Sequence, residues 1–157
     1  MGVDLKGVQI IRDPLEMVAS AYVYHHRGSE PGNPMQFGVP SMGPEVGVPV
    51  MAQRMLPVIR RMVGAYEVTA PDVLAVRYEN FTNSSEQFDA TVEKIMDFLF
   101  EMTQHQKTEI AMAARLEDLN RGKSYQRPGE IDVNHTNDED DMKVARAALP
   151  LIPADLY

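Results

Sequence analysis

The sequence contains no cysteine and no tryptophan among its 157 residues. The absence of cysteine excludes disulfides, thiolate catalysis and cysteine-based zinc sites, and it favours a reducing compartment such as the cytoplasm. No apolar run approaches the roughly 20 residues that a membrane-spanning helix needs. Basic residues are also in deficit, because 23 acidic against 15 basic side chains give a net charge of −8. We therefore expect no membrane span and no nucleic-acid-binding surface.

The first organised segment is a short apolar strand, a turn and a helix. Residues 8–12 are mostly β-formers after a glycine, which predicts a buried parallel strand. Asp13 is a candidate helix N-cap and Pro14 suits the first helical position. Arg12 then lies at the carboxyl end of a strand, where open α/β sheets bind ligands. The free N–H groups of the helix favour an anion there, and Ser20 could donate to the same group.

A second apolar strand is expected over residues 73–78. The connection between the two strands is long and contains a helix, so we predict that they pair in parallel in one sheet. Tyr78 ends the second strand, and its ring has a physical reason to stack on a nucleobase. Core packing at the strand end is the competing interpretation of Tyr78.

The remaining elements are expected to be helical. Apolar spacing predicts helices over 50–66, 86–102 and 105–119, with Pro57 kinking or dividing the first of them. Residues 28–50 are rich in glycine and proline, so we expect a loop without regular helix or strand. The acidic run 137–141 lacks the spacing of a calcium loop and suits the start of a helix capped by Asn137. No metal site is expected.

The order Arg-Asp-Pro, five residues, serine, one residue, tyrosine resembles the 3′-phosphate-binding segment of PAPS-dependent sulfotransferases, where PAPS is 3′-phosphoadenosine 5′-phosphosulfate. The resemblance implies that Arg12 and Ser20 bind the 3′-phosphate of this co-substrate. The strand ending in Tyr78-Glu79 is similar to a family strand whose tyrosine contacts the adenine. A strand–helix unit with a surface arginine and a solvated serine is the alternative for the first segment.

A third segment is similar to the family's Arg-Lys-Gly stretch, which closes over the 3′-phosphate. Its match is Arg127-Pro128-Gly129, where proline stands in place of the lysine. By the resemblance Arg127 completes the cofactor-binding set. Arg121-Gly122-Lys123 is a competing match to the same family segment. The alternative without a binding role is a solvated basic loop.

The resemblance implies an α/β fold, part of a P-loop-like doubly wound parallel sheet, mostly helical in this chain. It covers the C-terminal half of a sulfotransferase domain, so residues 1–157 are expected to form a single, incomplete domain. The family's phosphosulfate loop and catalytic base lie upstream of the Arg-Asp-Pro segment. The implied reaction transfers a sulfuryl group from PAPS to a hydroxyl or amine of an unknown acceptor, a carbohydrate or a small molecule.

No residue is a credible catalytic base, so we expect the isolated chain to be inactive. Two other function classes stay open: a non-catalytic nucleotide-binding or interaction fragment, and a P-loop kinase relative. A Golgi-lumen location is the alternative to the cytoplasm if an N-terminal anchor is missing.

Overall fold

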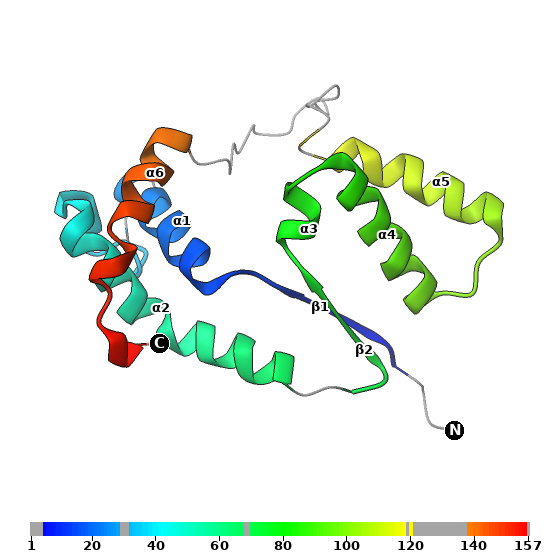
Figure 1. Cartoon of the computed structure of the whole chain (residues 1–157), viewed down its shortest axis with the longest axis horizontal. Coiled ribbons are helices and arrows are strands. Elements are labelled where there is room, and N and C mark those ends of the chain that lie inside the picture. The colour runs from blue at the N-terminus through cyan, green and yellow to red at the C-terminus, as the bar shows by residue number, and fades with distance from the viewer. Residues whose placement is uncertain (1–4, 29–31, 68–69, 119, 121–137, 157) are drawn as a thin grey trace. The chain divides into compact units, whose positions relative to one another are not determined.

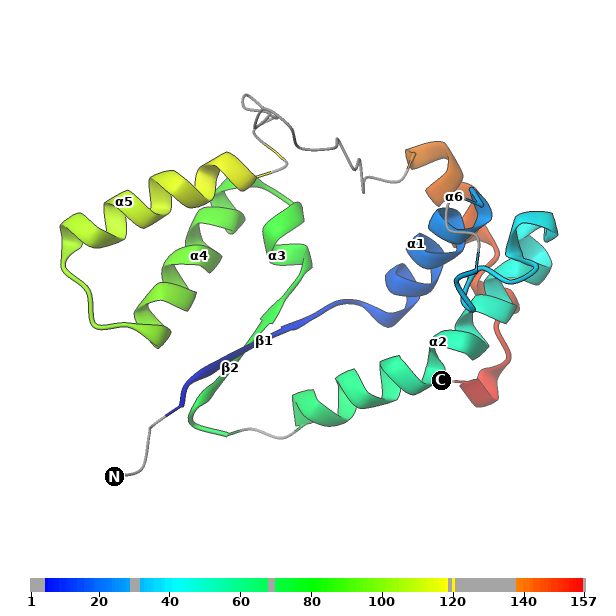
Figure 2. The same cartoon turned by 180° about the vertical axis from the view of Figure 1, so that it is seen from behind.

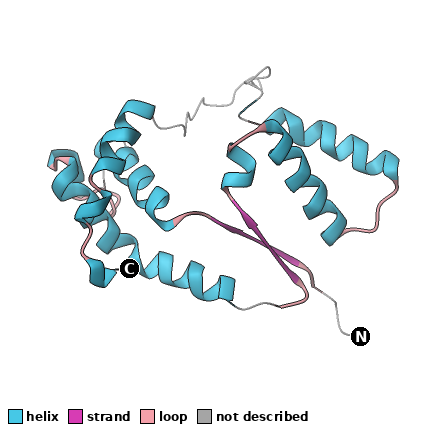
Figure 3. Ribbon diagram, in the orientation of Figure 1, coloured by secondary structure: helices cyan, strands magenta, loops and turns pink. Residues whose placement is uncertain are grey.

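The computed structural model describes residues 5–28, 32–67, 70–118, 120 and 138–156. Its contacts divide the chain into two compact units. Unit 1 comprises residues 1–12 and 65–131, and unit 2 comprises residues 13–64 and 132–157. Each unit is described by itself below. Together the described elements are mostly helical with one small sheet, which is compatible with the expected α/β class (Figure 3).

The sheet belongs to unit 1 and consists of β1 (Gly7–Ile11) and β2 (Val73–Arg77). The two strands pair in parallel, with Gly7 opposite Val73 and Ile11 opposite Arg77, which confirms the predicted parallel pairing (Figure 1). Main-chain hydrogen bonds extend the pairing beyond both ends. The Gly7 amide donates to the Asp72 carbonyl at 2.8 Å, and the Tyr78 amide donates to the Ile11 carbonyl at 2.6 Å.

Within unit 1, three described α-helices follow β2 (Figure 2). They are α3 (Glu79–Thr82), α4 (Ser85–Leu99) and α5 (Gln104–Ala114), so the two longer helices expected here are confirmed with shorter bounds. Ser84 caps α4 by accepting from the Gln87 amide at 3.2 Å. The small core of this unit includes the buried side chains of Val76, Phe88 and Val92. Burial of this apolar surface therefore joins β2 to α4.

A lysine ties β1 to the far end of α4. Lys6 Nζ donates to the Phe98 carbonyl oxygen at 2.9 Å and lies 5.5 Å from the centre of the Phe98 ring. Carbonyl groups in the last turn of a helix have no intrahelical partner, and cations are favourable there. Lys6 therefore satisfies such a group while it anchors the start of the strand.

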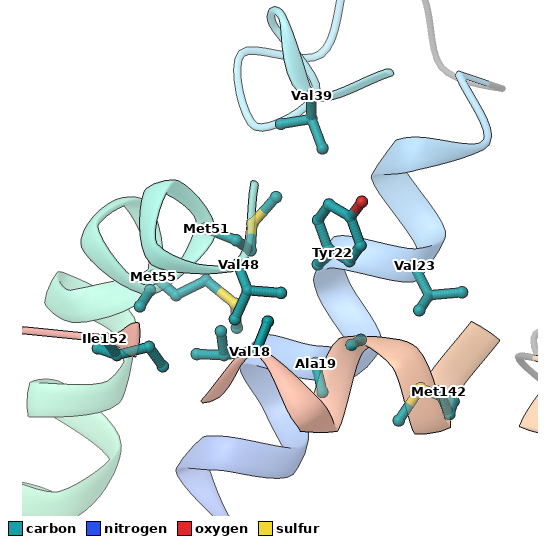
Figure 4. Packing of buried hydrophobic residues seen from close by; sticks show 13 residues of the cluster. Val18, Ala19, Tyr22, Val23, Val39, Val48, Met51, Met55, Met142 and Ile152 are labelled. Atoms are coloured by element: carbon teal, nitrogen blue, oxygen red, sulfur yellow. The ribbon is translucent and has the colours of Figure 1, made fainter. Parts of the chain in front are cut away.

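Unit 2 packs three helices around one hydrophobic core. They are α1 (Pro14–His26), α2 (Pro44–Glu67) and α6 (Glu139–Ala147). Figure 4 shows the side chains of α1 and α2 meeting, with Val18 and Tyr22 close to Val48 and Met51. The buried residues of this core are Val18, Ala19, Tyr22, Val23, Val39, Val48, Met51, Ala52, Met55, Met142, Ala145, Ala148 and Ile152. Tertiary packing of apolar faces thus holds these helices in place.

The prediction that residues 28–50 lack regular structure is wrong at its C-terminal end, because α2 begins at Pro44. Proline costs little at the first helical position. The Gly43 carbonyl accepts from the Val46 and Gly47 amides at 3.1 and 2.8 Å, which starts the helix. Complete burial of Val48 and Met51 then stabilises the first turns. The helix also runs through Pro57 without ending there.

The cap of α6 differs by one residue from the prediction. Asp138, not Asn137, is the N-cap, and its carboxylate accepts from the amides of Asp140 and Asp141 at 2.9 and 3.3 Å. Asn137 lies outside the described residues. Either side chain suits an N-cap, so the sequence pattern could not separate the two neighbouring positions. The acidic first turn of the helix is confirmed.

Candidate functional site

The candidate site lies at the carboxyl ends of the two parallel strands of unit 1. Arg12 follows β1 and Tyr78 follows β2, one residue beyond the last paired positions, Ile11 and Arg77. The hydrogen bond from the Tyr78 amide to the Ile11 carbonyl keeps the two chains together at this edge. Parallel strands end at the same edge of a sheet, so residues 66 positions apart in the sequence become neighbours.

The side chains of Arg12 and Tyr78 contact each other. The central guanidinium carbon of Arg12 lies 4.8 Å from the centre of the Tyr78 ring, which is a cation–π arrangement. Such a contact contributes roughly 0.5–1 kcal/mol when it is exposed to water. The Tyr78 residue is 36% exposed to solvent, so it is only partly covered. The strand edge therefore presents a cation and an aromatic ring side by side.

This pair can bind chemically distinct parts of one ligand. A guanidinium forms paired hydrogen bonds to phosphate or carboxylate, and an aromatic ring stacks on a flat apolar group. Neither group is the histidine or carboxylate that most often takes a proton in general acid–base catalysis. The arrangement can therefore bind a ligand that carries both an anionic group and a flat apolar group.

At the N-terminus of α1, which follows Arg12 in the sequence, the hydrogen bonding of the first amides differs from the expectation. The Asp13 carboxylate accepts from the Leu15 amide at 2.8 Å and from the Glu16 amide at 3.2 Å, and the Asp13 carbonyl accepts from Met17. The predicted cap is thus confirmed. The expected free N–H groups are occupied, because the anion at the start of α1 is the side chain of Asp13 itself. A bound phosphate would have to rely on side chains or displace this carboxylate.

The structure does not test the placement of the other two predicted site residues, Ser20 and Arg127, at this edge. Ser20 lies in α1 and belongs to unit 2, whereas Arg12 belongs to unit 1, so the convergence of Arg12 and Ser20 stays a prediction. Arg127 lies outside the described residues, as do Arg121 and Lys123 of the competing segment. The structure thus brings together two of the four predicted residues, Arg12 and Tyr78.

The sequence interpretation missed one consequence of the Asp13 cap: the Asp13 carboxylate occupies the amide groups that a bound phosphate would need. The sequence predicts a cap at Asp13 and a phosphate site at the helix terminus, but both use the same amide groups. A signal was present in the sequence, because a capping carboxylate and a bound anion compete for N–H groups in the first turn.

A separate hollow of about 230 Å³ lies between α4 and α5, and neither Arg12 nor Tyr78 lines it. Its rim carries charges of both signs in ion pairs. Arg115 Nη2 lies 2.8 Å from Asp89, and Lys107 pairs with Asp97. Because these charges compensate one another, we place the candidate site at the strand edge and not in this hollow.

Among the described residues, no group of three or more histidine and acidic side chains is arranged to hold a metal ion. In the same part of the chain, every helix is too short or too polar to cross a lipid bilayer. No family model, curated protein or solved structure matches this sequence.

Proposed function

We propose that the chain carries the nucleotide-binding part of a PAPS-dependent sulfotransferase with a P-loop-like sheet. Such an enzyme transfers a sulfuryl group from PAPS to a hydroxyl or amine of an acceptor. The observation that supports the proposal is the contact between Arg12 and Tyr78 at the carboxyl edge of β1 and β2. These are the residues that the resemblance assigns to the 3′-phosphate and to the adenine.

The chemistry of the co-substrate suits this pair. In PAPS the adenine and the 3′-phosphate are attached to the same ribose, so the groups that bind them must be close neighbours. Arg12 and Tyr78 are separated by 4.8 Å between guanidinium carbon and ring centre. The guanidinium fork fits phosphate oxygens, and the partly exposed ring offers a surface for the base. Arg12 would then turn from the ring toward the phosphate.

The resemblance assigns further roles that extend this proposal. Ser20 would donate its hydroxyl to the same 3′-phosphate, and Arg127 would close over it. Asp13 works against phosphate binding at the start of α1, because its carboxylate already accepts from the Leu15 and Glu16 amides. In our proposal the phosphate is therefore held by side chains and not by the N-terminus of α1.

A nucleotide-binding module without catalysis is the second candidate. This candidate is favoured by the two groups at the strand edge, because a guanidinium and a phenol ring are suited to bind a nucleotide. Both candidates share the binding site, and they differ in whether a transferred group leaves the bound nucleotide.

Titration calorimetry with adenosine 3′,5′-bisphosphate tests the binding site. We expect weak binding by the whole chain, and roughly ten- to a hundredfold weaker binding by Arg12→Ala, because a charge-assisted hydrogen bond contributes roughly 1.5–3 kcal/mol. Tyr78→Ala should weaken binding as well. Arg77→Ala is the matched control, since Arg77 is an exposed arginine one residue before Tyr78. Binding that Arg12→Ala leaves unchanged would refute the site.

Selectivity and turnover separate the two candidates. A sulfotransferase site should prefer the 3′,5′-bisphosphate over adenosine 5′-monophosphate, because Arg12 is assigned to the 3′-phosphate. Equal affinity for both nucleotides would refute that assignment and leave a general nucleotide-binding module. An assay with radiolabelled PAPS and varied acceptors should show no transfer by this chain alone. Transfer would reveal a base and a phosphosulfate site within these 157 residues.

A further inference from the structure

The loop between α1 and α2 in unit 2 is held in a defined shape over residues 33–43. Arg54 of α2 donates to the Met35 carbonyl at 2.7 Å and to the Phe37 carbonyl at 2.8 Å. The Asn33 side chain accepts from the Met35 amide at 2.9 Å. One guanidinium group thus ties the loop backbone to α2 at two positions, Met35 and Phe37.

The C-terminal half of the same loop is anchored in the core. Val39 is completely buried, and His26 Nδ1 lies 3.2 Å from its carbonyl oxygen. Gln36 is also buried, with 8% of its surface exposed. Gly38 has a φ of 76°, which only glycine adopts without strain and which lets the chain turn between Phe37 and Val39.

One large side chain of this anchored loop points away from the core. Phe37 is 82% exposed, although the residues on either side of it are buried or held by hydrogen bonds. A single exposed apolar side chain is ordinary on a protein surface. Phe37 differs because it lines a hollow of about 230 Å³ formed by its own loop.

The lining of that hollow has a distinctive chemistry. It combines three rings, from Pro34, Phe37 and Pro40, with two amide side chains, from Asn33 and Gln36. Two glycines complete the described lining, so no charged side chain is among the described lining residues. Pockets for drug-sized ligands are larger, roughly 300–1,000 Å³, so this hollow has room for about one ring.

We propose that this hollow, with Phe37 at its rim, binds a neutral sugar ring. A pyranose has an apolar C–H face that packs on an aromatic ring, and hydroxyl groups that exchange hydrogen bonds with amide side chains. Phe37 supplies the ring, and Asn33 and Gln36 supply the amides. The proposal does not depend on the sulfotransferase assignment, since Phe37 and Arg12 belong to different units.

Charge argues against an anionic ligand here. No charged side chain is among the described lining residues, and Arg54 directs its two terminal nitrogens at the Met35 and Phe37 carbonyls. An extended peptide is also less suitable, because proline-rich segments dock along grooves that accept several residues. A space for one ring, lined by amides and ring carbons, favours the sugar.

Saturation-transfer difference NMR on the whole chain tests this inference. The probes are methyl β-D-galactopyranoside, methyl β-D-glucopyranoside and methyl α-D-mannopyranoside. We expect transfer to at least one of them, strongest at the protons of one ring face. Phe37→Ala should raise the dissociation constant of that sugar about two- to tenfold, because an aromatic contact contributes about 0.5–1.5 kcal/mol. Phe37→Tyr should retain binding, because it keeps the aromatic ring.

Phe100→Ala is the matched control, because Phe100 is an exposed phenylalanine that does not line this hollow. Phe100→Ala should leave the transfer signal unchanged. The proposal is overturned if none of the three sugars receives saturation, or if Phe37→Ala retains the full signal. If a proline-rich peptide shifts the Phe37 amide resonance and the sugars do not, the ligand of this hollow is a peptide and the sugar proposal is overturned.

Discussion

The ring of Tyr22 lies directly against the backbone of Gly47. A Cβ atom on residue 47 would overlap the Tyr22 Cε2 atom and would stand 2.8 Å from Cδ2. The Tyr22 hydroxyl also donates to the Met42 carbonyl at 3.0 Å, just before α2 begins. One side chain of α1 therefore holds the beginning of α2 by packing and by a hydrogen bond.

This contact predicts opposite effects for two alanine substitutions in α2. Gly47→Ala should lower the free energy of unfolding by about 1–3 kcal/mol, because the new methyl group must displace a buried ring. Gly64→Ala is the control, since nothing lies within 4 Å of the added Cβ. It should raise stability by roughly 0.5–1 kcal/mol through helix propensity. Urea unfolding followed by circular dichroism measures both, and a neutral Gly47→Ala would contradict the observed packing.

Tyr22 also predicts a loss of stability at high pH. Burial raises the pKa of Tyr22 above its ordinary value of 10.0, and the negative charges of Glu45 and Asp141 raise it further. Below pH 10 both the folded and the unfolded chain keep this proton. As the pH rises above 10 the unfolded chain loses it first, so the free energy of unfolding falls.

Thermal unfolding measured from about pH 8 to about pH 11.5 tests this loss, with Tyr22→Phe as the reference. The variant should be less stable at neutral pH by about 1 kcal/mol, because the Met42 carbonyl loses its donor. Its melting temperature should then fall less steeply above pH 10. Parallel curves for the two proteins would show that Tyr22 titrates normally.

A salt bridge between α1 and α6 gives a third prediction. Arg146 donates to both oxygens of Glu16, at 2.9 and 3.0 Å, and to Glu139 at 2.7 Å. The hydrogen bonds that Arg146 donates to Glu16, and then those to Glu139, raise the pKa of Arg146, so it remains a cation throughout the accessible pH range. In a double-mutant cycle of Glu16→Gln and Arg146→Met we expect a coupling energy of about 0.5–1 kcal/mol, reduced by salt.

The second acidic partner provides the control for that cycle. The Glu139 side chain is 82% exposed, against 33% for Glu16, so solvent screens its interaction with Arg146 more strongly. Glu139→Gln should therefore change stability much less than Glu16→Gln. The assignment of Glu16 as the main partner fails if the two substitutions cost the same.

The capping carboxylate of α1 gives a fourth prediction. Asp13→Ala removes the acceptor for the Leu15 and Glu16 amides and should cost about 1 kcal/mol. It also frees those amides for an added anion. Sulfate should then raise the melting temperature of Asp13→Ala more than that of the unsubstituted chain, because the helix N-terminus favours negative charge.

Sulfate stabilises many proteins without binding to a site, so a second cap variant is needed. Ser84→Ala removes the N-cap of α4, where the serine hydroxyl accepts from the Gln87 amide at 3.2 Å. This variant also frees amide groups at a helix N-terminus, but no arginine is adjacent to that terminus in the sequence. Equal sulfate effects in the two variants would indicate a general salt response and no anion site beside Arg12.

The sequence by itself determined the features that depend on local chemistry. The sequence predicts the two apolar strands, the cap at Asp13 and the amphipathic helices because neighbouring residues decide them. The parallel pairing of β1 and β2 also followed from the sequence, since a long helical connection brings strands back in the same direction.

Only the tertiary structure decided the features that join distant residues. The pattern of glycine and proline around residues 44–50 indicates a loop, yet α2 begins at Pro44 because Gly47 receives the Tyr22 ring from another helix. The contact of Arg12 with Tyr78 likewise needs the register of the two strands. The physical reason is the same in each case: burial and hydrogen bonding in three dimensions override local propensity.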